Sequence, residues 1–123
     1  MSKSANPGEL RTSVYFIRVD RKTDDEAVPQ ETEVNVFGDT GAGRGVPIKV
    51  KWVNAHGTEI FTAMQLQLKS PATITMRYSP KINEQLIVYK GNDPQPYEII
   101  SIDNVDERNR WLEIKVQRKV SAR

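Results

Sequence analysis

Residues 98–116 constrain the fold more than any other stretch, because they have the pattern of two strands joined by a short charged turn. They read EIISIDNVDERNRWLEIKV, and the second half alternates apolar and polar residues. Such alternation puts Leu112, Ile114 and Val116 on one face of a strand and their polar neighbours on the other. The stretch therefore predicts a β-hairpin with one buried face, formed by residues 97–104 and 111–118.

The same period of two recurs along most of the chain. It predicts further strands at residues 12–20, 30–37, 47–53, 73–78 and 85–90. Residues 57–68 differ, since their apolar residues are spaced for one stripe of an amphipathic helix, with Thr58 as N-cap and Pro71 as a stop signal. The expected fold class is all-β: a small barrel or sandwich of six or seven strands, with one inserted short helix or loop at about 57–68.

The length and composition indicate a single domain. The chain has 123 residues, of which 37% are hydrophobic, and this suffices for one modest core. We expect a polar arm at residues 1–9, the domain at 10–118 and a frayed tail at 119–123. No apolar run is long enough to span a membrane. Cysteine is absent, which excludes disulfides and thiolate metal sites and fits a reducing cytoplasm.

The net charge of +2 hides a strong segregation of charge along the chain. Residues 20–39 carry seven acids and two bases, a balance of −5, whereas residues 40–81 carry six bases and one acid, a balance of +5. Residues 106–123, with six bases and three acids, add +3. Opposite charges in neighbouring segments suit contacts between copies or partners, although ordinary surface charge gives the same pattern. A domain whose main task is binding nucleic acid would normally be more basic.

The segment at residues 38–45, GDTGAGRG, has four glycines in eight residues and predicts a mobile loop. It is not a phosphate-binding P-loop, because Arg44 is followed by Gly45 and Val46 where that loop needs a lysine and a hydroxyl. A dinucleotide fingerprint would join a strand to a helix, whereas this segment joins two expected strands.

No other motif indicates catalysis, a metal or a cofactor. His56 is the single histidine, and alone it cannot form a zinc site of the usual kind. The acidic cluster of Asp24, Asp25 and Glu26 lacks the spacing of a calcium-binding EF-hand. We expect no enzyme activity, no cofactor and no metal.

Two further features allow more than one interpretation. The DERNR turn at residues 106–110 suits local salt bridges, and its best functional interpretation is a contact with another subunit through the bidentate arginine fork. Trp52 and Trp111 could stack on bases, but packing in the core or an interface is the simpler interpretation.

Several short motifs follow one another in an order that resembles the phage head–tail joining family, also called head closure or stopper proteins. They are GELR at 8–11, VKWVNAHGTEIFTAMQLQ at 50–67, ITMRY at 74–78, Pro80, VYKG at 88–91, YEI at 97–99 and NVDERNRWLE at 104–113. The resemblance covers residues 8–116 and is weaker from 21 to 47. Two departures are the glycine-rich segment at 38–45, which lengthens a strand connection, and Asn54, where proline is common.

The resemblance implies a small β-barrel with an inserted loop or helix, assembled as a ring of commonly about twelve copies. It implies a place at the head–tail junction of the virion, after synthesis in the host cytoplasm, with no membrane partner. There the ring would close the DNA channel below the portal and adaptor proteins and offer a platform to tail completion or tail tube proteins. The partners are therefore the chain itself, those proteins and the packaged double-stranded DNA. The segment at 53–68 would lie toward the channel or neighbouring subunits.

These implications and the charge pattern suggest two groups of contact residues. Candidates for the channel or for subunit contacts are Arg44, Lys49, Lys51, His56, Glu59, Gln65 and Gln67. Candidates for subunit interfaces are Asp24, Asp25, Glu26, Asp106, Glu107, Arg108 and Arg110. The basic residues of the first group could face DNA or the acidic patch of a neighbour. Alternative functions are a tail completion or adaptor protein of the same joint, although such adaptors are mostly helical, and a small barrel that binds single-stranded nucleic acid.

Overall fold

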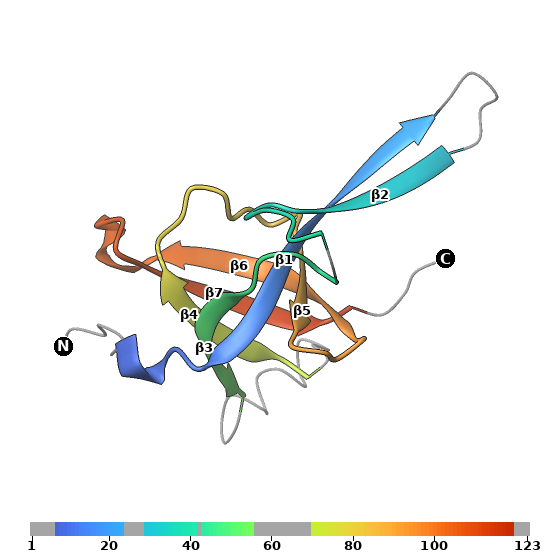
Figure 1. Ribbon diagram of the computed structural model, residues 1–123. Coiled ribbons are helices and arrows are strands. Elements are labelled where there is room, and N and C mark those ends of the chain that lie inside the picture. The colour runs from blue at the N-terminus through green and yellow to red at the C-terminus, as the bar shows by residue number, and fades with distance from the viewer. Residues whose placement is uncertain (1–6, 24–28, 42, 56–69, 120–123) are drawn as a thin grey trace.

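The computed structural model describes residues 7–23, 29–41, 43–55 and 70–119 (Figure 1). Its strands are β1 (Thr12–Thr23), β2 (Pro29–Asn35), β3 (Ile48–Asn54), β4 (Ala72–Arg77), β5 (Ile87–Lys90), β6 (Pro96–Asn104) and β7 (Trp111–Arg118). Two short 3-10 turns, η1 (Pro7–Glu9) and η2 (Val105–Glu107), complete the elements. The all-β fold class is confirmed, and each expected strand is present with bounds shifted by a few residues.

Six of the strands close into an antiparallel barrel. They follow one another in the order β1, β3, β4, β7, β6 and β5, and β5 pairs back to β1. Four residue pairs form this closure, from Val14 opposite Lys90 to Ile17 opposite Ile87. Closure gives every barrel strand two neighbours, which is how small all-β domains limit edge-to-edge association. The barrel, rather than the sandwich, is therefore the correct architecture.

The barrel interior is filled by the apolar face of every strand. Fully buried side chains come from all around it, and the largest are Phe16, Ile74, Met76, Leu86, Ile114, Val14, Val50, Val88 and Val116. On β7 the three residues expected on one face are all buried. On β1, Val14 and Phe16 point inward. Ile17 is buried as well, because it is paired on both sides, to Asn35 of β2 and to Ile87 of β5.

The second half of β1 leaves the barrel together with β2. Beyond Ile17, β1 pairs with β2 alone within the described residues, up to Thr23 opposite Pro29. These two strands project from the barrel as a long two-stranded arm (Figure 1). We call residues 18–23 and 29–34 the ribbon. Residues 21–23 and Pro29 thus extend the strands beyond the expected bounds of 12–20 and 30–37, and Arg21 and Glu31, 2.9 Å apart, pair across them.

The β6–β7 hairpin, expected from the sequence, has an irregular strand and an irregular turn. The register shifts between Ile99 and Ser101, and the bulged Ile100 is turned outward and exposed. In the turn, Asp106, Glu107 and Asn109 have φ between 52° and 57°.

Several expectations fall on residues that the structure does not describe. The helix at 57–68 lies outside the described residues, and so do the contact candidates Asp24, Asp25, Glu26, His56, Glu59, Gln65 and Gln67. In the part of the chain that the structure describes, no helix has the length and apolar character needed to cross a membrane.

Candidate assembly surfaces

The glycine-rich segment at 38–45 is closed at its base by hydrogen bonds. The side-chain amide of Asn35 donates to the carbonyls of Arg44 (2.8 Å) and Val46 (3.0 Å). The backbone N–H of Val46 donates to the carbonyl of Gly38 at 3.0 Å. Gly45 has φ +89°, and a Cβ there would come within 2.5 Å of the Gly38 carbonyl oxygen. These contacts fasten the two ends of the segment to each other and to β2, and the mobility of the loop stays a prediction.

Arg44 fastens the same segment to the barrel. Its guanidinium lies over the Tyr89 ring, 4.2 Å from the centroid, and donates to the carbonyls of Gly91 and Asp93 at 2.9 Å each. These contacts commit the guanidinium to its own chain. Sequence reasoning missed this anchoring role, since no local pattern connects residue 44 with residues 89–93.

Tyr89 joins the anchored segment to β2. Burial raises the pKa of its phenol, and the negative charge of Glu33, which accepts a hydrogen bond from it, raises the pKa further. The nearby Arg44 acts in the opposite direction but is outweighed. The phenol is thus kept neutral while it connects β5 with an acid at the base of the ribbon.

Trp52 of β3 packs against residues of β5 and β6. Its ring meets Tyr97 edge-on at 4.9 Å, and the Lys90 ammonium lies 4.8 Å from its centroid. The indole N–H donates to the side chain of Asn54 at 2.9 Å. These contacts favour the packing interpretation of Trp52, because an open stacking platform for bases needs a free ring face.

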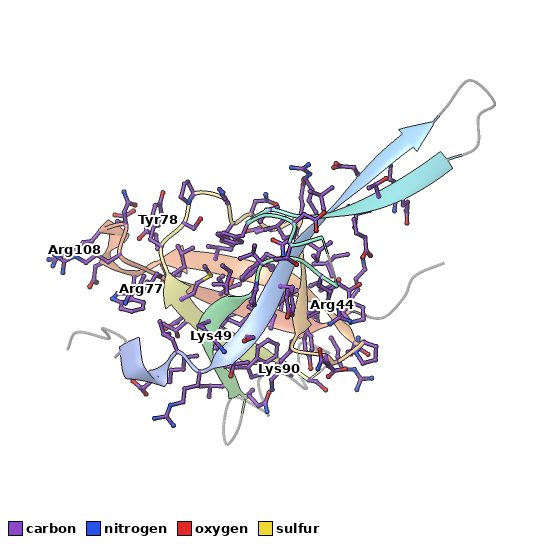
Figure 2. All side chains as sticks on the ribbon, viewed as in Figure 1. Arg44, Lys49, Arg77, Tyr78, Lys90 and Arg108 are labelled. Atoms are coloured by element: carbon purple, nitrogen blue, oxygen red, sulfur yellow. The ribbon has the colours of Figure 1, made fainter. Side chains whose placement is uncertain are left out.

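Strands β3 and β4 separate partway along the barrel wall. They pair from Lys51 opposite Thr75 to Asn54 opposite Ala72, and no further. A cavity of about 320 Å³ opens where they separate, lined by Leu10, Phe37, Pro47, Ile48, Lys49, Met76, Arg77, Tyr78 and Ser79. We call it the β3–β4 cleft. Figure 2 labels Lys49, Arg77 and Tyr78 on this part of the molecule, apart from Arg44.

Basic side chains surround the β3–β4 cleft. Lys49 is exposed at its mouth, and Arg77 lies over the Trp111 ring at 5.5 Å. Lys81 reaches over Phe37 at 5.6 Å, and no acidic residue is among the described residues that line the cleft. Lys51, in contrast, is paired with Glu9 at 3.1 Å. Of the three basic candidates in the described chain, Lys49 is therefore the one for which the described residues provide no ion-pair partner or hydrogen-bond acceptor.

The charged tip of the β6–β7 hairpin is a separate surface. Asp106, Glu107, Arg108 and Arg110 are all exposed, and Arg108 lies far from Arg44 in Figure 2. Among the described residues no ion pair involves the tip, so the expected local salt bridges do not form. The structure thus does not bring the tip and the basic candidates together into one site.

Over the described ranges, no group of three or more histidine and acidic side chains is arranged to hold a metal ion.

Comparisons with known proteins agree with this architecture. The solution structure of protein SF1141 from Shigella flexneri 2a is similar, with a TM-score of 0.64 over 96% of this chain and all of that one. The sequence identity is 18%, so this likeness concerns the fold alone. No curated protein matches the chain. The model of a family described as phage head completion protein matches residues 5–119. The chain therefore belongs to the phage head completion protein family and has a structural role in completing the phage head.

Proposed function

We propose that this protein is a head closure protein of a tailed phage, without enzyme activity. It assembles as a ring beneath the portal and adaptor proteins, closes the DNA channel after packaging and offers the platform to which the tail attaches. The observation that carries this proposal is the family match over residues 5–119. The domain is the barrel of residues 10–118, with 1–9 as an arm and 119–123 as a tail, and residues 53–68 face the channel or neighbouring copies.

The charge distribution supports assembly of copies. A ring is built from heterologous contacts, in which one patch of a copy meets a different patch of the next. Residues 20–39 carry a balance of −5 and residues 40–81 a balance of +5, so two separate segments of one copy supply the opposite charges that such a contact would use.

Two of the basic candidates, Arg44 and Lys51, fit a channel through which DNA passes without being held. Basic side chains that contact phosphates bind DNA strongly and in a salt-dependent way. Arg44 is engaged with backbone carbonyls and Lys51 with Glu9, so neither is free to bind phosphate without losing a contact.

Electron microscopy of particles from a phage that lacks this protein tests the proposed function. We expect packaged heads that leak DNA and carry no tails, because nothing closes the channel or receives the tail. Supplying the protein in trans restores tailed particles. Normal tailed particles in its absence would show that the proposal is wrong.

A further inference from the structure

We propose that neighbouring copies are joined ribbon to ribbon: the open edge of β1 in one ribbon pairs with the open edge of β2 in the ribbon of the next copy. The ribbons of the assembly then continue one another as a single antiparallel sheet. The proposal rests on the ring assembly proposed above and specifies which strands hold the copies together.

The ribbon has two edges that no described strand covers. Strand β5 accompanies β1 only as far as Ile17, opposite Ile87, so residues 18–23 of β1 have an open side. In the part of the chain that the structure describes, β2 pairs with β1 alone, so its far side is open as well. The ribbon also stands clear of the barrel in Figure 1. Open strand edges are templates for an added strand, and a two-stranded ribbon is only marginally stable in water.

The direction of the main-chain groups shows which residues these edges offer. In antiparallel strands the N–H and C=O of one residue point to the same side, and those of the next residue point to the other side. The carbonyl of Phe16 accepts a hydrogen bond of 3.1 Å from the N–H of Val36, the residue after β2. The even-numbered residues of β1 therefore bond to β2, whereas Arg21 turns its main-chain groups to the open edge. Its partner in the register, Glu31, likewise turns its own to the open edge of β2.

The symmetry of a ring decides which edges meet. Copies related by rotation about one axis hold their ribbons in the same direction, so β1 of one copy runs antiparallel to β2 of the next. A contact between two β2 edges or two β1 edges is isologous and needs a two-fold axis between the copies. A ring therefore joins unlike edges and, once closed, leaves no ribbon edge open.

The charges at the two edges agree with this pairing. Within one ribbon Arg21 and Glu31 lie 2.9 Å apart, and their side chains are still 78% and 57% exposed. If the register of the ribbon is repeated between copies, Arg21 lies opposite Glu31 of the next copy. Each of these side chains then lies between two opposite charges, which form an alternating ladder around the ring. Opposite charges directly across two strands stabilise a sheet.

Pairing of like edges would not give such a ladder. Two β2 edges in antiparallel contact along most of their length bring Glu31 or Glu33 opposite an acid of the other copy, and like charges placed opposite each other destabilise a sheet. The repeated register also pairs all of residues 18–23 with all of residues 29–34. Main-chain bonds thus provide the contact, and the alternation of charge sets its register, although the ribbon as a whole is neutral.

Disulfide trapping tests the contact, because the chain contains no cysteine of its own. In the proposed register, Asp20 of one copy and Thr32 of the next form a non-hydrogen-bonded pair with Cα atoms about 4.5 Å apart, within the reach of a disulfide. Asp20→Cys and Thr32→Cys are prepared as separate variants, mixed in equal amounts, bound to heads that lack the protein and oxidised. Each copy holds one thiol, so every disulfide joins two copies.

We expect a dimer linked through residues 20 and 32 at about one junction in four, because random mixing around a ring brings the two thiols face to face at that rate. Each variant bound alone should give no dimer, since like edges do not meet. Gel electrophoresis without reductant measures the dimer, and mass spectrometry identifies the linked residues.

Proline at the β2 edge provides an independent measurement. The N–H of Glu31 points to the open edge, so Glu31→Pro keeps the hydrogen bonds within the ribbon and removes one to the neighbour. Glu31→Ala is the matched control, because it loses the same side chain and keeps the N–H. We expect uptake of Glu31→Pro onto heads to be at least about tenfold lower than that of Glu31→Ala. Thermal unfolding checks the barrel, and NMR contacts between Asp20 and Thr32 check the ribbon of the free protein.

The outcomes separate this inference from the proposed function. The inference is overturned if the mixed variants give no disulfide between residues 20 and 32, if either variant alone gives a dimer on heads, or if Glu31→Pro is taken up as well as Glu31→Ala. In each of these cases the ring proposal stands, as long as the native protein restores tailed particles. Failure of the native protein to bind heads would overturn both.

Discussion

At the scale of single residues, Arg44 shows how sequence position and role can differ. In the sequence it is one cation in a glycine-rich loop and a candidate for DNA contact. In the fold its guanidinium lies on Tyr89 and donates to two carbonyls of the turn after β5. Planarity and a fixed fork of donors allow arginine, and not lysine, to make both kinds of contact at once.

We expect Arg44→Ala to lower the free energy of unfolding by about 2 kcal/mol, because it removes a cation–π contact and two hydrogen bonds from a charged donor. Arg44→Lys should recover only part of this loss. Urea unfolding measures both. Arg108→Ala, at the exposed hairpin tip, is the control and should stay within about 0.5 kcal/mol of the native protein. Unchanged stability of Arg44→Ala would mean that the anchor is not needed for folding.

Because of Tyr89, we expect the free energy of unfolding to fall as the pH becomes alkaline. Burial and Glu33 raise its pKa above the ordinary value of 10.0, so the folded state holds this proton more tightly than the unfolded chain. The resulting stabilisation is present below about pH 10 and is lost as the pH rises through the raised pKa. Tyr89→Phe should therefore lose less stability than the native protein between pH 9 and pH 11, measured by urea unfolding. Equal losses would contradict this.

At the scale of elements, two glycines of the glycine-rich segment differ in the space that is available to an added side chain. Gly45 and Gly41 both have positive φ, +89° and +81°. A Cβ at Gly45 would collide with backbone, whereas a Cβ at Gly41 would have no atom within 4 Å. We expect Gly45→Ala to cost more than about 2 kcal/mol of unfolding free energy and Gly41→Ala about 1 kcal/mol. Thermal or urea unfolding of the pair measures this, and equal costs would refute the close approach.

The ribbon should be dispensable for folding and required for assembly. Arg18 lies opposite Val34, so replacing residues 19–33 with Asn-Gly leaves a two-residue hairpin loop. We expect this variant to keep the barrel, because residues 12–17 of β1 still pair with β3 and β5. Circular dichroism and thermal unfolding test the fold, and uptake onto heads tests the assembly. A variant that unfolds, or one that binds heads normally, would contradict one half of this expectation.

Sequence patterns predicted the strands wherever apolar and polar residues alternate. The alternation at residues 73–78 and 111–118 identified β4 and β7, because Ile74 and Ile114 must be excluded from water. The far end of the ribbon, residues 21–23 and Pro29, was missed, because the polar run RKTDDE has no hydrophobic period. The contact of Arg44 with Tyr89 joins residues far apart in the chain, and no local spacing encodes it.

At the scale of the whole molecule, the separation of charge should make assembly sensitive to salt. Raising the ionic strength from 0.1 M to 1 M shortens the Debye length from about 10 Å to about 3 Å. We therefore expect uptake onto portal–adaptor complexes to fall as salt rises, and to fall also when Asp24, Asp25 and Glu26 are replaced by lysine. Sedimentation of the complexes measures both. If neither change alters ring formation, charge complementarity does not contribute to it.

Strand β1 belongs to two structures at once. Its first residues seal the barrel against β5, and its last residues form the ribbon, without an interruption between them. At about 3.3 Å per residue, its 12 residues make a stiff rod of about 40 Å. A force that pulls on the ribbon tip is therefore carried along the rod to the seam, where it shears the β1–β5 hydrogen bonds. The strand therefore couples the ribbon mechanically to the closure of the barrel.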